Sequence, residues 1–205
     1  MKKIKSDDRV TAFGATGTGK TTLMKELTRD LKRLVVFDTK GSLDDWNTIE
    51  WNEGRKRFLR GESMRLRIVP PLGVDETEFW DAFLWICFDV GDLTIYADEL
   101  YSLSSESGRA SRILKNVYTR GREFGIGMWA SAQRPSLIPL FAISESNHLF
   151  IFRLNMEEDR RRLASFAGDR VMNPIRDPHG FYHYVVTDDQ ATYYKTFQKK
   201  EVMNT

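Results

Sequence analysis

Short runs of apolar residues recur along the chain, and segments with a helical spacing of apolar residues lie between them. Six runs are continuous and rich in β-branched and aromatic residues: 10–13, 34–37, 66–69, 93–97, 126–131 and 149–152. Such runs are typical of strands that are buried on both faces of a parallel sheet. Strands that alternate with helices predict an α/β fold with right-handed crossovers.

The clearest helix signal lies at residues 21–32, where Leu23, Leu27 and Leu31 stand four residues apart and form one apolar stripe. Residues 77–88 and 108–124 show a similar pattern, so three helices are expected between the strands.

The last part of the chain differs from the rest. Residues 180–186 and 191–197 alternate in character around the polar segment 187–190, which predicts an antiparallel hairpin that finishes the sheet.

Residues 41–64 form the least regular stretch and predict a partly helical excursion with a solvated basic face. Trp46 and Trp51 lie near its basic residues, which are Arg55, Lys56, Arg57 and Arg60. They are compatible with stacking on nucleic acid bases, or with packing as aromatic plugs of an irregular loop.

Composition narrows the class of protein. The 205 residues are 41% hydrophobic and 29% charged, which excludes a disordered chain and fits one domain over residues 1–205. The 31 Lys and Arg against 29 Asp and Glu give a net charge of +2, so any nucleic acid binding must come from a local patch. Cys87 is the only cysteine, which excludes an intrachain disulfide and a multi-cysteine zinc site.

No segment suggests a membrane anchor. The longest apolar run, residues 83–88, is far shorter than the ~20 residues that span a bilayer. The first ten residues lack the apolar region of a signal peptide. We therefore expect a soluble protein with no stable membrane insertion.

Residues 14–21 match the phosphate-loop pattern GxxxxGK[ST] without a mismatch, after a predicted strand and before a predicted helix. Glycines let backbone N–H groups curl around phosphates, and the helix adds its positive amino terminus. Lys20 is expected to reach the β and γ phosphates of ATP, and the Thr21 hydroxyl to hold Mg²⁺. The predicted ATP-binding residues are Gly14, Ala15, Thr16, Gly17, Thr18, Gly19, Lys20, Thr21 and Thr22.

Asp98 and Glu99 directly follow the predicted strand 93–97, which is the Walker B pattern. Asp98 is expected to hold the water ligands of Mg²⁺, and Glu99 to polarise the attacking water. An acid pair after a strand alone can also cap the next helix. Together with the phosphate loop, the pair predicts an ATPase.

Three further blocks narrow the choice of family. They read Asp-x-Lys-Gly at residues 38–41, Arg-x-x-Gly-Ile at 122–126 and Ser-x-Gln-Arg-Pro at 131–135. In this order they resemble the FtsK/HerA superfamily of hexameric DNA-translocating ATPases, over about residues 9–170. The resemblance implies a RecA/ASCE-type P-loop NTPase with a mainly parallel sheet flanked by helices, in which the strand before Gln133 lies between the phosphate-loop and Walker B strands. Gln133 is then the sensor beside the γ-phosphate, or else a polar strand cap.

Hydrolysis in such rings uses a cation from the neighbouring subunit, and arginine suits this role because its planar fork stays charged. The resemblance implies Arg122 and Arg161 as the catalytic candidates, with Arg120 and Arg160 as close rivals. For each of them, a solvated helix face is the alternative interpretation.

The chain has no room for the accessory domains of FtsK-type or HerA-type proteins, so it resembles the viral genome-packaging branch, the PRD1-type and poxvirus A32-like ATPases. Within that branch the likeness is closest to the packaging ATPases of Sulfolobus turreted icosahedral viruses. The resemblance implies an ATP- and Mg²⁺-dependent translocase that packages viral double-stranded DNA into a preformed capsid.

The expected partners follow from that resemblance. They are double-stranded DNA bound without sequence preference, further copies of the chain in a ring, expected to be a hexamer, and capsid or internal-membrane vertex proteins. The expected location is the host cytoplasm or the packaging vertex of the virion. Two alternatives stay open: a cellular or plasmid translocase of the same superfamily in conjugation or repair, and a protein that uses ATP as an assembly switch without translocation.

Overall fold

The structure is a computed structural model that describes residues 3–104, 110–173, 175, 181–187 and 191–196. In this part of the chain, nine strands form one sheet with the order β3-β4-β2-β5-β6-β1-β7-β8-β9. The strands are β1 (Arg9–Phe13), β2 (Leu34–Phe37), β3 (Ile49–Glu50), β4 (Arg65–Ile68), β5 (Leu93–Ala97), β6 (Ile126–Ala132), β7 (His148–Ile151), β8 (Phe181–Val186) and β9 (Ala191–Thr196).

The strands from β3 to β7 in this order are parallel, and β8 and β9 pair antiparallel as a hairpin against β7. The predicted parallel sheet with a C-terminal antiparallel hairpin is therefore confirmed.

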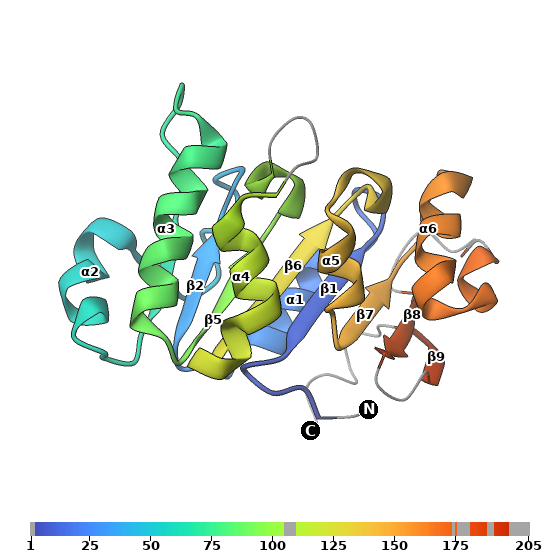
Figure 1. Cartoon of the computed structure of the whole chain (residues 1–205), viewed down its shortest axis with the longest axis horizontal. Helices are drawn as coiled ribbons and strands as arrows, with labels where there is room; N and C mark the ends of the chain where they lie inside the picture. The colour runs from blue at the N-terminus through green and yellow to red at the C-terminus, as the bar shows by residue number, and fades with distance from the viewer. Residues whose placement is uncertain (1–2, 105–109, 174, 176–180, 188–190, 197–205) are drawn as a thin grey trace.

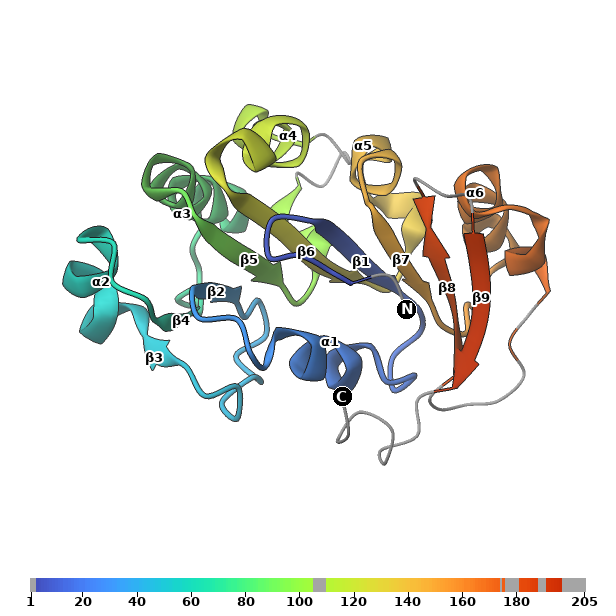
Figure 2. The ribbon, with the colours of Figure 1, turned by 90° about the horizontal axis from the view of Figure 1, so that it is seen from below.

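Helices cover both faces of the sheet (Figures 1 and 2). The α-helices are α1 (Lys20–Thr28), α2 (Trp51–Leu59), α3 (Glu76–Val90), α4 (Arg112–Arg120), α5 (Leu140–Ser144) and α6 (Glu157–Ala167). The 3-10 turns are η1 (Leu100–Leu103), η2 (Gly121–Phe124), η3 (Pro135–Leu137) and η4 (Asp169–Met172). Figure 2 shows α3, α4, α5 and α6 on one face, α1 on the other, and α2 at the β3 end. In the described part of the chain, no helix is long and apolar enough to cross a membrane.

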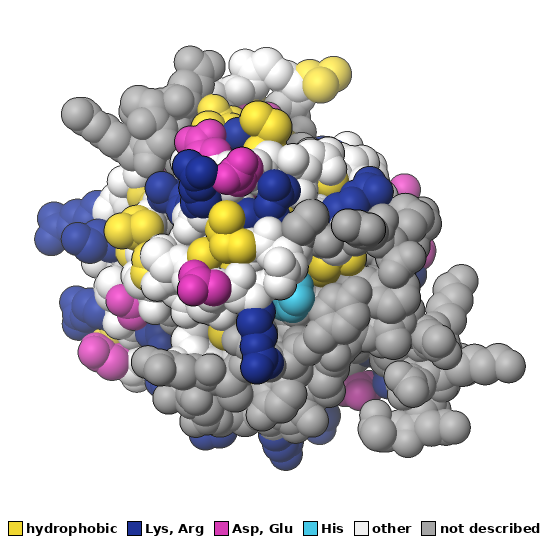
Figure 3. All heavy atoms as spheres, turned by 90° about the vertical axis from the view of Figure 1, so that its right-hand side faces the viewer, with side chains coloured by type: hydrophobic (Ala, Val, Ile, Leu, Met, Phe, Trp, Pro, Cys, Tyr) yellow, Lys and Arg dark blue, Asp and Glu magenta, His cyan; other side chains and the backbone are white. Residues whose placement is uncertain are grey.

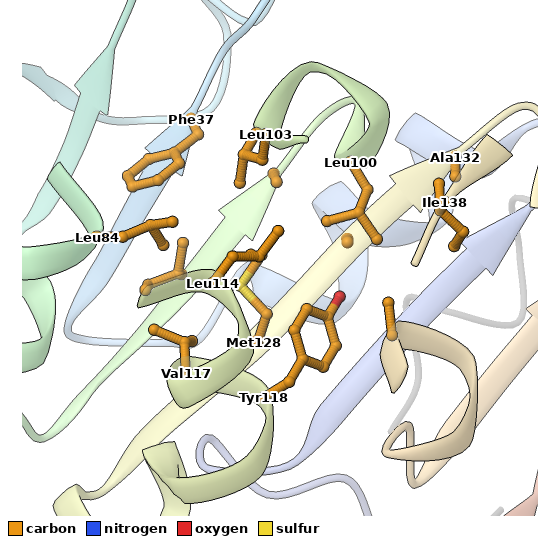
Figure 4. Close-up of a cluster of buried hydrophobic side chains, with 14 of the residues drawn as sticks. Phe37, Leu84, Leu100, Leu103, Leu114, Val117, Tyr118, Met128, Ala132 and Ile138 are labelled. Atoms are coloured by element: carbon orange, nitrogen blue, oxygen red, sulfur yellow. The ribbon is translucent and has the colours of Figure 1, made fainter. Parts of the chain in front are cut away.

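The larger core cluster lies between the sheet and the helices α3 to α6 (Figure 4). Leu114 and Tyr118 of α4 pack there with Met128 of β6. The other face is covered by α1 and by the segment after β2, where Trp46 stacks on Tyr96 with ring centroids 4.6 Å apart. Trp46 is 2% exposed and so cannot stack on bases.

Trp51 is partly buried and packs edge-on against Phe58 and Phe83. Both tryptophans are therefore aromatic plugs of the fold, and the stacking interpretation of Trp46 is wrong.

Two helices begin at side-chain caps. Asp75 accepts a hydrogen bond from the backbone N–H of Glu78 at the start of α3, and Ser111 accepts one from Leu114 at the start of α4. Helix α1 ends four residues earlier than its leucine spacing predicts. The guanidinium group of Arg65 binds the carbonyl oxygens of Thr28 and Leu31 at 2.6 and 2.9 Å, and so satisfies the free end of the helix.

The topology brings the sequence motifs to one edge of the sheet. Strand β6 pairs with β1 on one side and with β5 on the other, as predicted for the strand before Gln133. Because parallel strands end at the same edge, the residues after β1, β2, β5 and β6 meet there.

Candidate active site

The phosphate loop joins β1 to α1 and requires glycine for two reasons. Gly17 and Gly19 have φ angles of +77° and +104°, which side-chain-bearing residues rarely adopt. Gly14 stands where a Cβ atom would lie 2.6 Å from Cβ of Phe152 and 2.9 Å from Oγ1 of Thr18. The loop therefore needs glycine both for its curvature and for its close approach to the segment after β7.

Lys20 opens α1 and bends back over the loop. Its ammonium group donates to the carbonyl oxygens of Gly14 at 2.7 Å and Ala15 at 3.0 Å. The side chain is buried, and this burial lowers the pKa of Lys20. An ammonium group held by neutral carbonyl oxygens can exchange them for the charged oxygens of a phosphate.

The two acids follow β5 at the same edge. Asp98 is 8% exposed, and burial raises its pKa. The Glu99 side chain is 12% exposed. Burial also raises the pKa of Glu99, although the charge of Lys40 opposes this shift. A buried carboxylate with a raised pKa is a better proton acceptor than an exposed one.

Gln133 links the acid to the phosphate loop. Thr16 donates from its hydroxyl to Oε1 of Gln133 at 3.1 Å, and the backbone N–H of Gln133 donates to the Glu99 carboxylate. The structure thus brings together Lys20 at the start of α1, the acid pair after β5 and Gln133 after β6.

Lys40 is a residue of this site that the motif analysis did not assign. Its ammonium nitrogen lies 3.6 Å from Oε2 of Glu99. The signal in the sequence was the Asp-x-Lys-Gly block, which gave the family but no role for its lysine.

The oxygen donors at the site fit Mg²⁺. Among the described residues, no group of three or more His, Cys, Asp or Glu side chains can hold a metal ion on its own. Mg²⁺ usually keeps several waters and binds through one or two protein oxygens together with substrate phosphates. The Thr21 hydroxyl and the Asp98 carboxylate would supply those protein oxygens.

A pocket of about 400 Å³ adjoins the phosphate loop on its α6 side. Its lining includes Thr16, Gln133, Arg153 and Asp159. Asp159 is buried and accepts from Nε of Arg134 at 2.7 Å, so an ion pair ties the end of β6 to α6.

The two candidate arginines lie apart from this cluster. Arg122 is in η2, before the amino end of β6, and so at the opposite edge of the sheet from Lys20. Arg161 is exposed on α6 and lies 2.7 Å from Glu157, one turn earlier. Figure 3 shows this end of the molecule, where basic and acidic side chains lie side by side.

The two rival candidates, Arg120 and Arg160, also contact residues of their own chain. Arg120 lies 3.5 Å from Glu123, and Nη1 of Arg160 donates to the carbonyl oxygen of Leu154 at 2.8 Å. Both contacts are within the chain.

No protein-family model matches the chain. A curated relative does: the DNA packaging ATPase P9 of Enterobacteria phage PRD1 is 32% identical over 169 residues, which are 78% of this chain and 70% of P9. The chain belongs to this family of viral DNA packaging ATPases. The resemblance to the packaging branch of the FtsK/HerA superfamily is thereby confirmed, and the protein is an ATPase.

Solved structures agree with this packaging ATPase fold. The genome packaging NTPase B204 of Sulfolobus turreted icosahedral virus 2, in complex with AMPPCP, superposes with a TM-score of 0.78 at 12% identity, over 95% of this chain and 100% of B204. VirB4 of Thermoanaerobacter pseudethanolicus superposes with a TM-score of 0.68 at 9% identity, over 97% of this chain and 92% of VirB4. At these identities the likeness shows the fold alone.

Proposed function

We propose that this packaging ATPase hydrolyses ATP to move viral double-stranded DNA into a preformed capsid. The observation that carries the proposal is the meeting of Lys20, Asp98, Glu99 and Gln133 at one edge of the sheet, in a chain related to P9. In the proposed site, Lys20 is the phosphate-binding cation, Asp98 the metal-binding acid, Glu99 the base and Gln133 the neutral amide.

The proposed roles follow from the chemistry of each group. Lys20 leaves the loop carbonyls and binds the β and γ phosphates of ATP. Thr21 and Asp98 hold Mg²⁺, which when bound neutralises charge on those phosphates. Glu99 accepts a proton from the attacking water. Gln133 orients the water or donates to the γ-phosphate without adding charge.

The proposed assembly is a ring, a hexamer, in which a neighbour completes each site. Arg122 and Arg161 are the candidates for the trans-acting cation, because arginine stays charged and can bind a phosphate bidentately. DNA is held through its phosphates, so binding should be independent of sequence and weakened by salt. Capsid or vertex proteins are the proposed docking partners, and the packaging vertex the proposed place of action.

The test is an ATPase assay with and without double-stranded DNA, on wild type and on the variants Lys20→Ala and Glu99→Gln. We expect DNA to stimulate wild-type turnover. Glu99→Gln should bind ATP with nearly wild-type affinity but lose turnover by about 100-fold or more. Lys20→Ala should lose ATP binding as well.

Two results would contradict the proposal. Turnover by Glu99→Gln at the wild-type rate would show that Glu99 is not the base. ATP hydrolysis that DNA does not stimulate would favour the alternative of an ATP-driven assembly switch.

A further inference from the structure

We propose that Lys40 is a positioning residue for the catalytic base, and that this is the role of the Asp-x-Lys-Gly segment at residues 38–41. The inference rests on the proposed function, because it requires Glu99 to be the base. It adds a residue to the site that neither the phosphate loop nor the acid pair contains.

The segment lies next to the acids because β2 and β5 are neighbours. Phe37 and Ala97 are paired residues at the ends of these strands, and the backbone N–H of Asp98 donates to the carbonyl of Phe37 at 3.1 Å. The residues that follow the two strands therefore leave the sheet side by side.

The turn that carries Lys40 is fixed by hydrogen bonds to a buried carboxylate. Asp38 is fully buried, and its carboxylate accepts the backbone N–H groups of Ser42 at 3.0 Å and Leu43 at 2.9 Å. Arg67 of β4 lies 3.3 Å from the same carboxylate. A buried acid bonded on three sides fixes the turn, so Lys40 is presented from a defined backbone position.

Lys40 faces Glu99 by charge rather than through a tight hydrogen bond. The distance of 3.6 Å between Nζ of Lys40 and Oε2 of Glu99 exceeds the usual hydrogen-bond length. The Glu99 side chain is 12% exposed whereas that of Lys40 is 50% exposed, so water screens the base poorly and the lysine has room to follow it.

Lys20 does not take this place beside Glu99, because its ammonium group donates to the carbonyl oxygens of the phosphate loop. Within the described residues, Lys40 is the only cation that forms an ion pair with Glu99. Without Lys40, the Glu99 carboxylate would still accept a hydrogen bond from the backbone N–H of Gln133. It would lose the positive charge that attracts it from the β2 side. The base would then be less well placed, and a small misplacement slows the chemical step strongly.

The experiment measures kcat and the KM for ATP in the full chain for Lys40→Met and Lys40→Arg. Methionine keeps the length of the side chain and removes the charge, whereas arginine keeps the charge. We expect Lys40→Met to lower kcat by about tenfold or more with KM changed less than about twofold, and Lys40→Arg to recover most of kcat.

Lys25→Met is the matched control. Lys25 is a partly exposed lysine on α1 whose ion-pair partner, Asp45, lies outside the site. This variant should keep wild-type kcat and KM. Thermal unfolding of the four proteins checks that all of them are folded.

Two outcomes would overturn the inference. Unchanged kcat in Lys40→Met would show that Glu99 needs no partner on the β2 side. A raised KM with unchanged kcat would mean that Lys40 binds the phosphates instead of the base. Glu99→Gln, assayed beside these variants, separates a failure of the proposed function from a failure of this inference. An active Glu99→Gln contradicts the proposed function. An inactive Glu99→Gln together with a fully active Lys40→Met contradicts only the role of Lys40.

Discussion

The guanidinium group of Arg122 lies 2.5 Å from the carboxylate of Asp8, at the edge of the sheet opposite the phosphate loop. The Asp8 side chain is 7% exposed and also lies 3.2 Å from Nε2 of His148. Arg122 thus joins the segment before β6 to the segment before β1. Its side chain is 45% exposed and also lies 3.7 Å from the carboxylate of Asp7 and 3.4 Å from Oδ1 of Asn147.

Arg122→Ala should therefore affect both stability and catalysis, whereas Arg122→Lys should separate them. Removing the guanidinium group leaves a buried carboxylate short of a partner, and we expect a loss of about 1–3 kcal/mol in the free energy of unfolding. Lysine can keep the contact with Asp8 but not the bidentate geometry, so DNA-stimulated turnover should fall in both variants. Urea unfolding and the ATPase assay measure the two effects.

Mixing variants tests whether Arg122 acts in trans. A Lys20→Ala subunit keeps its arginine and an Arg122→Ala subunit keeps its phosphate loop, so a mixed ring contains some complete sites. We expect two inactive proteins to regain activity when they are mixed. If verified co-assembly restores no turnover at any ratio, Arg122 acts within its own chain.

Arg161→Ala should leave stability nearly unchanged, because the pair with Glu157 is exposed on both sides. Pairs of this kind contribute about 0.3–0.5 kcal/mol. If Arg161 serves a neighbouring site, the variant should lose turnover at wild-type stability. Glu157→Ala is the control, since it breaks the same ion pair and keeps the arginine. Equal turnover in both variants would remove Arg161 from the list of trans-acting candidates.

The elements that the sequence predicted best are those whose cause is local. The bounds of β2 and β5 match the prediction because continuous apolar runs mark strands that are buried on both faces. Strand β3 consists of two exposed residues and forms through its pairing with β4, so no apolar run in the sequence predicts it. Helix α6 carries mostly polar residues, so no apolar stripe predicted its bounds.

The site shows the same division. The phosphate loop and the acid pair have fixed spacings and could be assigned before the fold was known. The contact between Lys40 and Glu99 joins two strands that are adjacent in the sheet but distant in the chain. The carbonyl oxygen of Thr28 at the end of α1 is likewise bound by Arg65, which lies 37 residues further along the chain. Spacing within one segment carries no signal for such contacts.

Glycine substitutions should separate two kinds of constraint in the phosphate loop. Gly14→Ala places a Cβ atom 2.6 Å from Cβ of Phe152, so the loop and the segment after β7 must move apart. Gly17→Ala meets no atom within 4 Å and carries only the strain of its φ of +77°, about 1–2 kcal/mol. We expect Gly14→Ala to lose more stability in urea unfolding than Gly17→Ala, and ATP binding as well.

Gly61→Ala is the control for backbone strain, because Gly61 has a φ of +82°, meets no atom within 4 Å and lies outside the site. It should lose as much stability as Gly17→Ala while ATP binding stays at the wild-type level. A Gly14→Ala protein as stable as Gly61→Ala would show that the loop can shift away from Phe152.

Cys87 offers a readout of nucleotide binding that does not depend on turnover. The thiol is 1% exposed on α3, and burial raises its pKa to about 12. The reactive thiolate is therefore nearly absent in the folded protein at pH 8, whereas an unfolded cysteine has a pKa of about 8.5. Alkylation by iodoacetamide should proceed only through unfolding.

A ligand that binds the folded state makes unfolding rarer. A non-hydrolysable ATP analogue should therefore slow the alkylation of wild type and leave the alkylation of Lys20→Ala unchanged. If the native protein is labelled rapidly and the analogue does not change the rate, the reagent reaches Cys87 by local opening of α3.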